Sequence, residues 1–111
     1  MTYEEYRNAR VEEIEKKLGR FDYSLARPSS PRVDNEPLEE RDVMMIDNNS
    51  KYKGQWSTRT GLRHGRGVQV WPDGSIYEGY WKHDKAEGRG RLIHSDGDVY
   101  EGEWKEDKAN G

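Results

Sequence analysis

Three histidines and a scatter of carboxylates are the residues of this chain that could do chemistry. His83 stands directly before Asp84, and His94 lies two residues before Asp96. Neither pair has the spacing of a metal-ligand set, and no cysteine is present to supply a thiolate ligand. The histidines also occupy loop and strand-end positions where other copies of the repeat described below carry unrelated residues. We therefore expect no metal site.

The carboxylates of the second half do not form a hydrolytic pair. They are explained as solvated strand residues alternating with aromatic ones; these are Glu78, Glu101, Glu103 and Glu106. A Ser/His/Asp arrangement, a P-loop and a GxGxxG motif are all absent, and the stretch HGRGVQV has only two glycines of the last motif. We expect no catalytic residue, no cofactor and no enzymatic activity.

Few aliphatic residues are available to fill a conventional core. Hydrophobic residues make up 31% of the 111 residues and charged residues 37%, which favours a quasi-one-dimensional or partly disordered structure. Aromatic rings compensate, since four Trp and seven Tyr are present and each ring buries a large surface. The net charge is −3 and neither half carries a basic stripe, which argues against nucleic-acid binding. The N-terminus lacks an apolar stretch, so we expect neither secretion nor a membrane span.

An internal repeat organises the second half of the chain. The sequences YKGQW, YEGYW and YEGEW begin at Tyr52, Tyr77 and Tyr100, and each is followed by a polar loop and a glycine step that recurs every 23 residues. The loop after the first of these sequences contains a two-residue insertion. The glycines that we interpret as structural are Gly54, Gly79 and Gly102 in the strands, Gly65, Gly67, Gly88 and Gly90 in the steps, and Gly74 and Gly97 in turns.

Each unit is expected to be a β-hairpin. Asp73-Gly74 and Asp96-Gly97 lie between alternating runs, which predicts type I′ turns with positive φ at both residues. Asn48-Asn49 stands at the equivalent place before the first full unit, so the array is expected to begin near residue 43.

Alternation within the strand SIYEGYWK places Tyr77, Gly79 and Trp81 on one face of the sheet. The glycine between two aromatic residues leaves bare backbone, over which a neighbouring ring can lie flat. A single hairpin of this kind is marginal in water, so successive units are expected to stabilise one another.

The units YEGYWKHDKAEGRGRLIHSDGDV and YEGEWKEDKANG resemble the MORN repeat, a Tyr-x-Gly-x-Trp strand followed by a glycine step. The resemblance covers residues 43–111. It implies a mostly β fold, namely an elongated, single-layer antiparallel sheet of successive hairpins twisted into a shallow groove. Because the last unit breaks off at Gly111, we expect further repeats to follow in the natural protein.

The segment before the array has a different character. The sequence TYEE predicts a helix start with Thr2 as N-cap and Glu5 three residues on, and residues 1–20 are expected to form an amphipathic helix. Its narrow apolar stripe consists of Val11, Ile14 and Leu18. This stripe either packs on the protein's own sheet as a cap or docks on another chain, and its acidic polar face argues against membrane insertion. Residues 21–42, with three prolines and dense charge, are expected to form an extended linker.

The half-covered aromatic face is the surface from which we expect function, because Tyr and Trp dominate interface energetics. The candidate partner-binding rings are Tyr52, Trp56, Tyr77, Trp81, Tyr100 and Trp104. Similarity to MORN proteins of ciliary axonemes and the cytoskeleton suggests a cytoplasmic scaffold that binds other proteins of a large assembly.

Two other functions stay open at this point. One is binding to phosphoinositides or a membrane surface, and the other is regulation of an enzyme that continues beyond residue 111. A lipid-binding surface needs clustered positive charge, whereas the residues after Ser50 carry 11 basic and 10 acidic side chains with mixed signs. This favours the scaffold. The open edges of the hairpins also make self-association an expectation.

Overall fold

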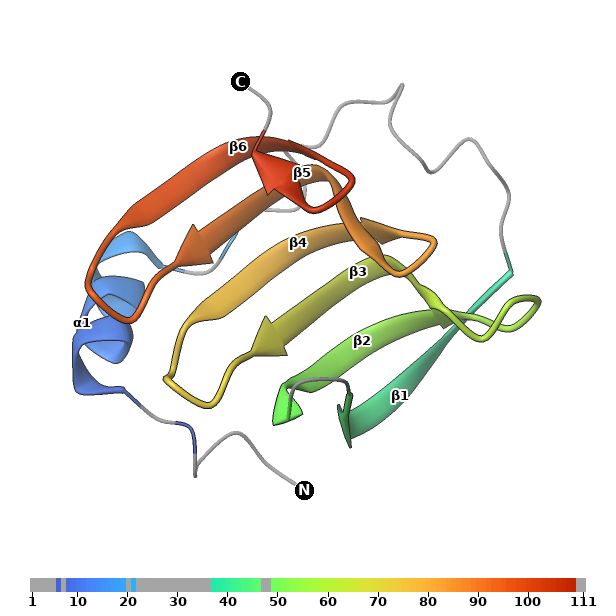
Figure 1. The fold of residues 1–111 in the computed structure, drawn as a ribbon, viewed down its shortest axis with the longest axis horizontal. Helices are drawn as coiled ribbons and strands as arrows, with labels where there is room; N and C mark the ends of the chain where they lie inside the picture. The colour runs from blue at the N-terminus through green and yellow to red at the C-terminus, as the bar shows by residue number, and fades with distance from the viewer. Residues whose placement is uncertain (1–5, 7, 20, 22–36, 47–48, 110–111) are drawn as a thin grey trace.

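The computed structural model describes residue 6, residues 8–19, residue 21, residues 37–46 and residues 49–109. Within them the chain forms a helix followed by a single seven-stranded sheet (Figure 1). In chain order the elements are α1 (Ala9–Leu18), β1 (Leu38–Met45), β2 (Lys51–Ser57), β3 (Arg63–Val70), β4 (Ile76–Lys82), β5 (Lys85–Ile93), β6 (Val99–Lys105) and β7 (Lys108–Ala109). The molecule measures 38 × 30 × 21 Å along its principal axes.

The sheet is the antiparallel meander that the repeat predicts. Each strand pairs with its neighbours in sequence, in the order β1 to β7. β1 begins at Leu38, which pairs with Ser57, so the sheet starts earlier than residue 43 and takes in part of the expected linker. Residues 22–36 of that linker lie outside the described part of the chain.

Tyrosine rings lying on glycine backbone form the core of the sheet. A Cβ atom added to Gly90 would stand 2.1 Å from the hydroxyl oxygen of Tyr77, and one added to Gly67 would stand 2.0 Å from that of Tyr52. Each ring therefore fills the space that a side chain on the next strand would need. Its hydroxyl group donates to its own strand, to the carbonyl of Tyr80 at 3.2 Å in the case of Tyr77. The slot was predicted at the glycine between two aromatic residues, but the rings lie over the step glycines instead. At Gly79 itself an added Cβ would meet the hydroxyl oxygen of the flanking Tyr77 at 2.6 Å and the Cα of Gly90 at 2.5 Å.

The Asp-Gly hairpins form, but their turns are not of type I′. In the turn between β3 and β4 only Gly74 has positive φ, at 93°, and its N–H donates to the carbonyl of Trp71 at 2.9 Å. Asp73 stays outside the left-handed region because its carboxylate accepts the N–H of Ser75 at 2.9 Å, as is usual for an Asx turn. This hydrogen bond is the main reason that the pKa of Asp73 is lowered. The prediction of positive φ at both residues was wrong.

Positive φ at two successive residues occurs instead in the short charged loops that follow β4 and β6. His83 and Asp84, with φ of 49° and 73°, join β4 to β5. Glu106 and Asp107, with φ of 48° and 69°, join β6 to β7 in the same way. Two-residue loops of this kind match the twist of the flanking strands. These turns were not predicted, because neither loop contains a glycine.

The helix is shorter than the segment 1–20 expected from sequence. Asn8 is its N-cap, in extended conformation, and its side chain accepts the N–H groups of Arg10 at 2.9 Å and Val11 at 3.2 Å. Helix α1 therefore begins at Ala9, and the predicted capping residues Thr2 and Glu5 lie outside the described residues. Its end at Gly19, with φ of 77°, agrees with the sequence.

Helix α1 packs on the sheet face opposite the tyrosine rings. Arg91 on β5 donates to the carbonyl of Gly19 at 2.8 Å, and Arg10 on the helix donates to the carbonyl of Asp96 at 3.0 Å. Val11 is 3% exposed, whereas Leu18 at the far end of the stripe is 49% exposed. Of the two uses predicted for the stripe, the structure therefore shows the cap on the protein's own sheet.

Gly90→Ala should destabilise the fold by about 2–3 kcal/mol, because the new methyl group overlaps the Tyr77 ring and the backbone cannot move away. Gly102→Ala is the matched control, since its Cβ would stand 3.0 Å from the nearest atom of Tyr100 and should cost less than about 1 kcal/mol. Urea unfolding followed by tryptophan fluorescence measures both. Equal losses in the two variants would contradict the proposed ring-on-glycine packing.

Candidate functional site

Two of the three tryptophans of the predicted aromatic face, Trp81 and Trp104, donate a hydrogen bond to the preceding hairpin. The indole N–H of Trp81 donates to the carbonyl of Gly67, and that of Trp104 to the carbonyl of Gly90, both at 3.1 Å. The Trp81 ring stands at 90° to Tyr52 with 5.5 Å between centroids, an edge-to-face contact that favours both rings. The face is thus a row of rings, each nearly perpendicular to the next, packed on backbone glycines. We call this row, Tyr52, Trp56, Tyr77, Trp81, Tyr100 and Trp104, the ladder.

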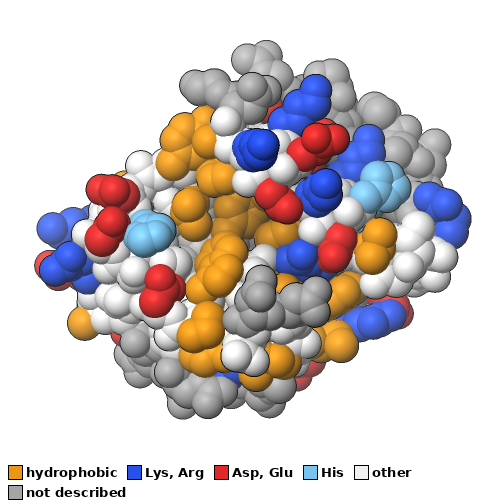
Figure 2. All heavy atoms as spheres, viewed as in Figure 1, with side chains coloured by type: hydrophobic (Ala, Val, Ile, Leu, Met, Phe, Trp, Pro, Cys, Tyr) orange, Lys and Arg blue, Asp and Glu red, His pale blue; other side chains and the backbone are white. Residues whose placement is uncertain are grey.

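Most of the predicted partner-binding rings are buried in this ladder. Tyr52 is 0% exposed, Tyr77 and Trp81 are each 2% exposed, and Trp56 is 7% exposed. Tyr100 and Trp104, in the last repeat, are only half-buried. In the view of Figures 1 and 2, α1 lies behind the sheet, and hydrophobic side chains gather in a band across the face turned to the viewer. Among the described residues, the least buried of the six rings are therefore those of the last matched repeat.

Two arginines that sequence reasoning missed cover tryptophans of the ladder. The guanidinium carbon of Arg41 lies 5.4 Å from the ring centre of Trp56, and that of Arg63 lies 4.3 Å from Trp81. Arg63 also lies 5.7 Å from the ring centre of Tyr52. These are cation–π distances, which favour the stacked arrangement. The repeat gave no signal for Arg63, because the equivalent residue of the next unit is Ala86.

Arg63 is also held by hydrogen bonds in the plane of its guanidinium. Its Nε donates to Asp84 Oδ1 at 2.6 Å, its Nη2 to the Asp84 carbonyl at 2.8 Å, and its Nη1 to Gln69 Oε1 at 2.6 Å. The side chain is 13% exposed. Acceptors around the edge of the guanidinium and rings on its face together hold the Arg63 side chain in one orientation.

The opposite face carries charge, but not all of it is solvated as predicted. Glu78 is 15% exposed and accepts from Arg91, itself 3% exposed, at 3.2 Å. Arg91 lies 3.9 Å from Glu101, which also accepts from Arg89 at 3.3 Å. Glu78 is largely covered because α1 lies over this part of the sheet, which the sequence alone did not indicate. The prediction of a solvated Glu78 was wrong.

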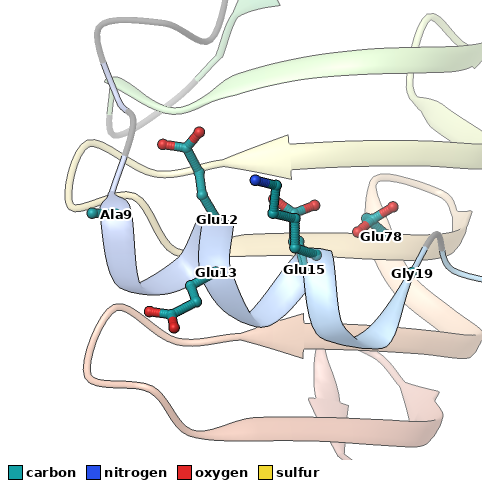
Figure 3. A pocket seen from close by; sticks show the side chains of 7 residues that line it. Ala9, Glu12, Glu13, Glu15, Gly19 and Glu78 are labelled. Atoms are coloured by element: carbon teal, nitrogen blue, oxygen red, sulfur yellow. The ribbon is translucent and has the colours of Figure 1, made fainter.

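A hollow of about 600 Å³ lies between α1 and β4. Its walls are Ala9, Glu12, Glu13, Glu15, Lys16, Gly19 and Glu78. Figure 3 shows Glu15 on the helix and Glu78 on the strand beside the same hollow. Burial, with the nearby Glu78 as the second cause, raises the pKa of Glu15 to about 7 against the opposing effect of Arg91. Two adjacent carboxyl groups under a helix favour a shared proton.

The histidines do not meet the carboxylates in a metal-binding arrangement. The rings of His64 and His83 contact each other edge to face, with centroids 5.2 Å apart, and His94 Nδ1 lies 3.2 Å from Asp96 Oδ1. Across the described ranges no group of three His, Cys, Asp or Glu residues could hold a metal ion. Nor is any helix described here long and apolar enough to cross a membrane.

Comparison with known families agrees with this architecture. The MORN repeat model matches three consecutive segments, residues 52–76, 77–99 and 100–111, and each segment begins at the tyrosine of a Tyr-x-Gly-x-Trp strand. The chain belongs to the MORN-repeat family. A search of curated proteins found no match. MORN repeats are generally non-enzymatic, and they are consistent with a module that binds proteins or membranes.

The shared proton of Glu15 predicts that stability falls as pH rises from about 5 to about 8. Because the pKa of Glu15 is raised from 4.5 to about 7, the folded chain holds in this window a proton that the unfolded chain has lost. The effect should be on the order of 1 kcal/mol, since Glu15 is partly exposed and its interactions are screened.

Urea unfolding at pH 5 and pH 8 measures this difference. Glu15→Gln carries a neutral side chain at both values and should remove this contribution to the pH dependence, whereas Glu13→Gln, at an exposed position of the same helix, should keep it. An unchanged pH dependence in Glu15→Gln would show that the helix is not held by this proton.

Proposed function

We propose that this MORN-repeat chain is a non-enzymatic scaffolding module that binds other proteins through the C-terminal end of its aromatic face. The observation that carries the proposal is the gradient of exposure along the ladder, from Trp81 at 2% exposed to a half-buried Trp104. Large rings that are partly exposed beside a rigid, buried core are typical of interface anchors, because they lose little conformational entropy on binding.

The edge of the sheet at the same end supports this choice. β7 pairs with only two residues of β6, Trp104 and Lys105. Along residues 99–103 the described part of the structure therefore pairs β6 on one side alone, with β5. A partner strand or a further repeat can add to such an edge by main-chain hydrogen bonds. The rings and the free edge together make one continuous surface.

Charge favours a protein partner over a membrane. Basic residues of the helix-covered face are paired with acidic ones, Arg91 with Glu78 and Arg89 with Glu101. Paired charges of this kind present little net positive potential, which anionic lipids require. The family resemblance further supports a cytoplasmic assembly, ciliary or cytoskeletal, as the setting. Regulation of an enzyme that follows residue 111 is the remaining alternative.

Trp104→Ala should abolish stable co-purification with protein partners while the chain stays folded. Lys105→Ala, an exposed neighbour on the other face, is the control and should retain them. Trp81→Ala is unsuitable as a binding variant, because removing this buried ring should cost about 3–5 kcal/mol of stability. Quantified pull-downs, with circular dichroism to verify folding, measure the difference. Partners retained by Trp104→Ala would overturn the proposal.

The same proposal predicts no salt-sensitive binding to vesicles. Liposomes with and without phosphoinositides should sediment equal and minor amounts of the full chain at low salt, since the basic residues are paired. Co-sedimentation that requires the phosphoinositide and disappears at high salt would favour the membrane-binding alternative instead.

A further inference from the structure

Arginine recurs over the tryptophans of the ladder, except at the last one. Arg41 lies over Trp56 and Arg63 lies over Trp81. Among the described residues no cation lies over Trp104, and this ring is half-buried while Trp56 and Trp81 are buried. The third tryptophan thus has the same place in the repeat but lacks the arginine that covers its two counterparts.

The site that holds Arg63 is rebuilt one repeat later with alanine in place of the arginine. Each residue of the first site has a counterpart 23 residues later, or 25 residues later for the tyrosine, which precedes the two-residue insertion. The pairs are Arg63 and Ala86, Asp84 and Asp107, Gln69 and Leu92, Trp81 and Trp104, and Tyr52 and Tyr77. Three of the five positions keep their residue type, namely the aspartate, the tryptophan and the tyrosine, whereas leucine replaces the glutamine and alanine replaces the arginine.

The walls of the second site have the geometry of the first. Asp107 has φ of 69° against 73° for Asp84. Its N–H donates to the carbonyl of Ala86 at 3.0 Å, as that of Asp84 donates to Arg63 at 2.9 Å. Its Oδ1 accepts the N–H of Ala86 at 2.7 Å. The carboxylate therefore stands beside Ala86 as the other carboxylate stands beside Arg63.

The ring walls repeat as well. Trp104 and Tyr77 meet edge to face at 84° with centroids 5.2 Å apart, against 90° and 5.5 Å for Trp81 and Tyr52. Both indoles donate to a glycine carbonyl of the preceding hairpin at 3.1 Å. The ring that stacks on the guanidinium of Arg63 thus has a counterpart in the same orientation.

We propose that Trp104 and Asp107, which lie next to the partly buried Leu92 and above the buried Ala86 and Tyr77, bind an arginine side chain of a partner protein. This inference rests on the proposed protein-binding function and names the chemistry of the partner residue. The Trp104 face receives the guanidinium plane, and the exposed Asp107 carboxylate accepts its N–H groups.

Arginine fits this site better than lysine. A guanidinium is planar, so it stacks on a ring while its edge donates to a carboxylate, and it is more weakly hydrated than an ammonium group. Leu92 stands where Gln69 accepts from Arg63, so the second site offers one acceptor fewer and an apolar wall for the side-chain stem. The incoming arginine is therefore held chiefly by Asp107 and Trp104.

The test uses the full chain and two short blocked peptides, Gly-Arg-Gly and Gly-Lys-Gly. Nuclear magnetic resonance reports the indole N–H signal of Trp104, assigned with Trp104→Phe. The arginine peptide should shift this signal and leave that of Trp81 in place, and the lysine peptide should bind about threefold or more weakly. Asp107→Asn keeps the turn, since Asn tolerates positive φ, and should weaken arginine binding about fivefold.

A second variant fills the site from within. The double change Ala86→Arg with Leu92→Gln copies the Arg63 and Gln69 arrangement and should abolish the peptide-induced shift without unfolding the chain. Equal shifts with both peptides, no shift with arginine, or a shift that persists in the filled variant would each overturn the inference.

The outcome separates this inference from the function on which it rests. If pull-down partners depend on Trp104 but the arginine peptide does not bind, the partner uses other chemistry and only the inference fails. If partners also persist in Trp104→Ala, the proposed function fails with it.

Discussion

The packing of a tyrosine ring on the bare backbone of the next strand is the interaction on which the whole sheet depends. Tyr52 lies on Gly67 and Tyr77 lies on Gly90, each so close that a methyl group has no room between ring and strand. A single-layer sheet has no second layer to bury its side chains, so the rings must be buried against the sheet itself. Glycine makes this approach possible, and tryptophan rings perpendicular to the tyrosines cover the remaining exposed sides of Tyr52 and Tyr77.

The opposite face solves the same problem with a helix. Its aliphatic residues include Val70 and Ile93, which are 5% and 0% exposed, and α1 lies over part of this face. The helix also encloses charge, and Arg91 compensates by donating to both the Gly19 carbonyl and Glu78. A buried arginine with two acceptors tolerates burial far better than an unpaired one. The raised pKa of Glu15 is a cost of this arrangement, because a second carboxyl group shares the enclosure.

The sequence determined the sheet more clearly than the local backbone or the burial of the rings. Alternation and the repeat placed Tyr77, Gly79 and Trp81 on one face, and the structure agrees. The turn type of Asp73-Gly74 was predicted wrongly. The Asp73 carboxylate accepts the N–H of Ser75, and this hydrogen bond keeps Asp73 out of the positive-φ conformation that an Asp-Gly pair suggests. Exposure of the rings was overestimated, since Arg63 at the start of β3 contacts Tyr52 and Trp81, and its counterpart in the next repeat is alanine. Such a contact between distant residues does not recur from repeat to repeat, so the repeat pattern of the sequence cannot reveal it.

Packing in the ladder has a direction, and this explains the difference between its two ends. Tyr52 and Tyr77 each lie on a glycine of the following strand, while Trp81 and Trp104 each donate back to a glycine carbonyl 14 residues earlier.

At the N-terminal end, the hydrogen bond from the tryptophan indole to the preceding hairpin is missing. The residue 14 positions before Trp56 is Asp42, which lies where β1 departs from regular pairing, and among the described residues the buried indole N–H of Trp56 has no acceptor. At the other end of the described strands, the tyrosine has no glycine of a following strand to pack on. Tyr100 lies near Gly102 of its own strand and stays half-buried, because β7 reaches only the last two residues of β6. The ladder is therefore fully closed only in its middle, around Tyr77 and Trp81, where the hydrogen bond to the preceding hairpin and the packing on the following strand are both present.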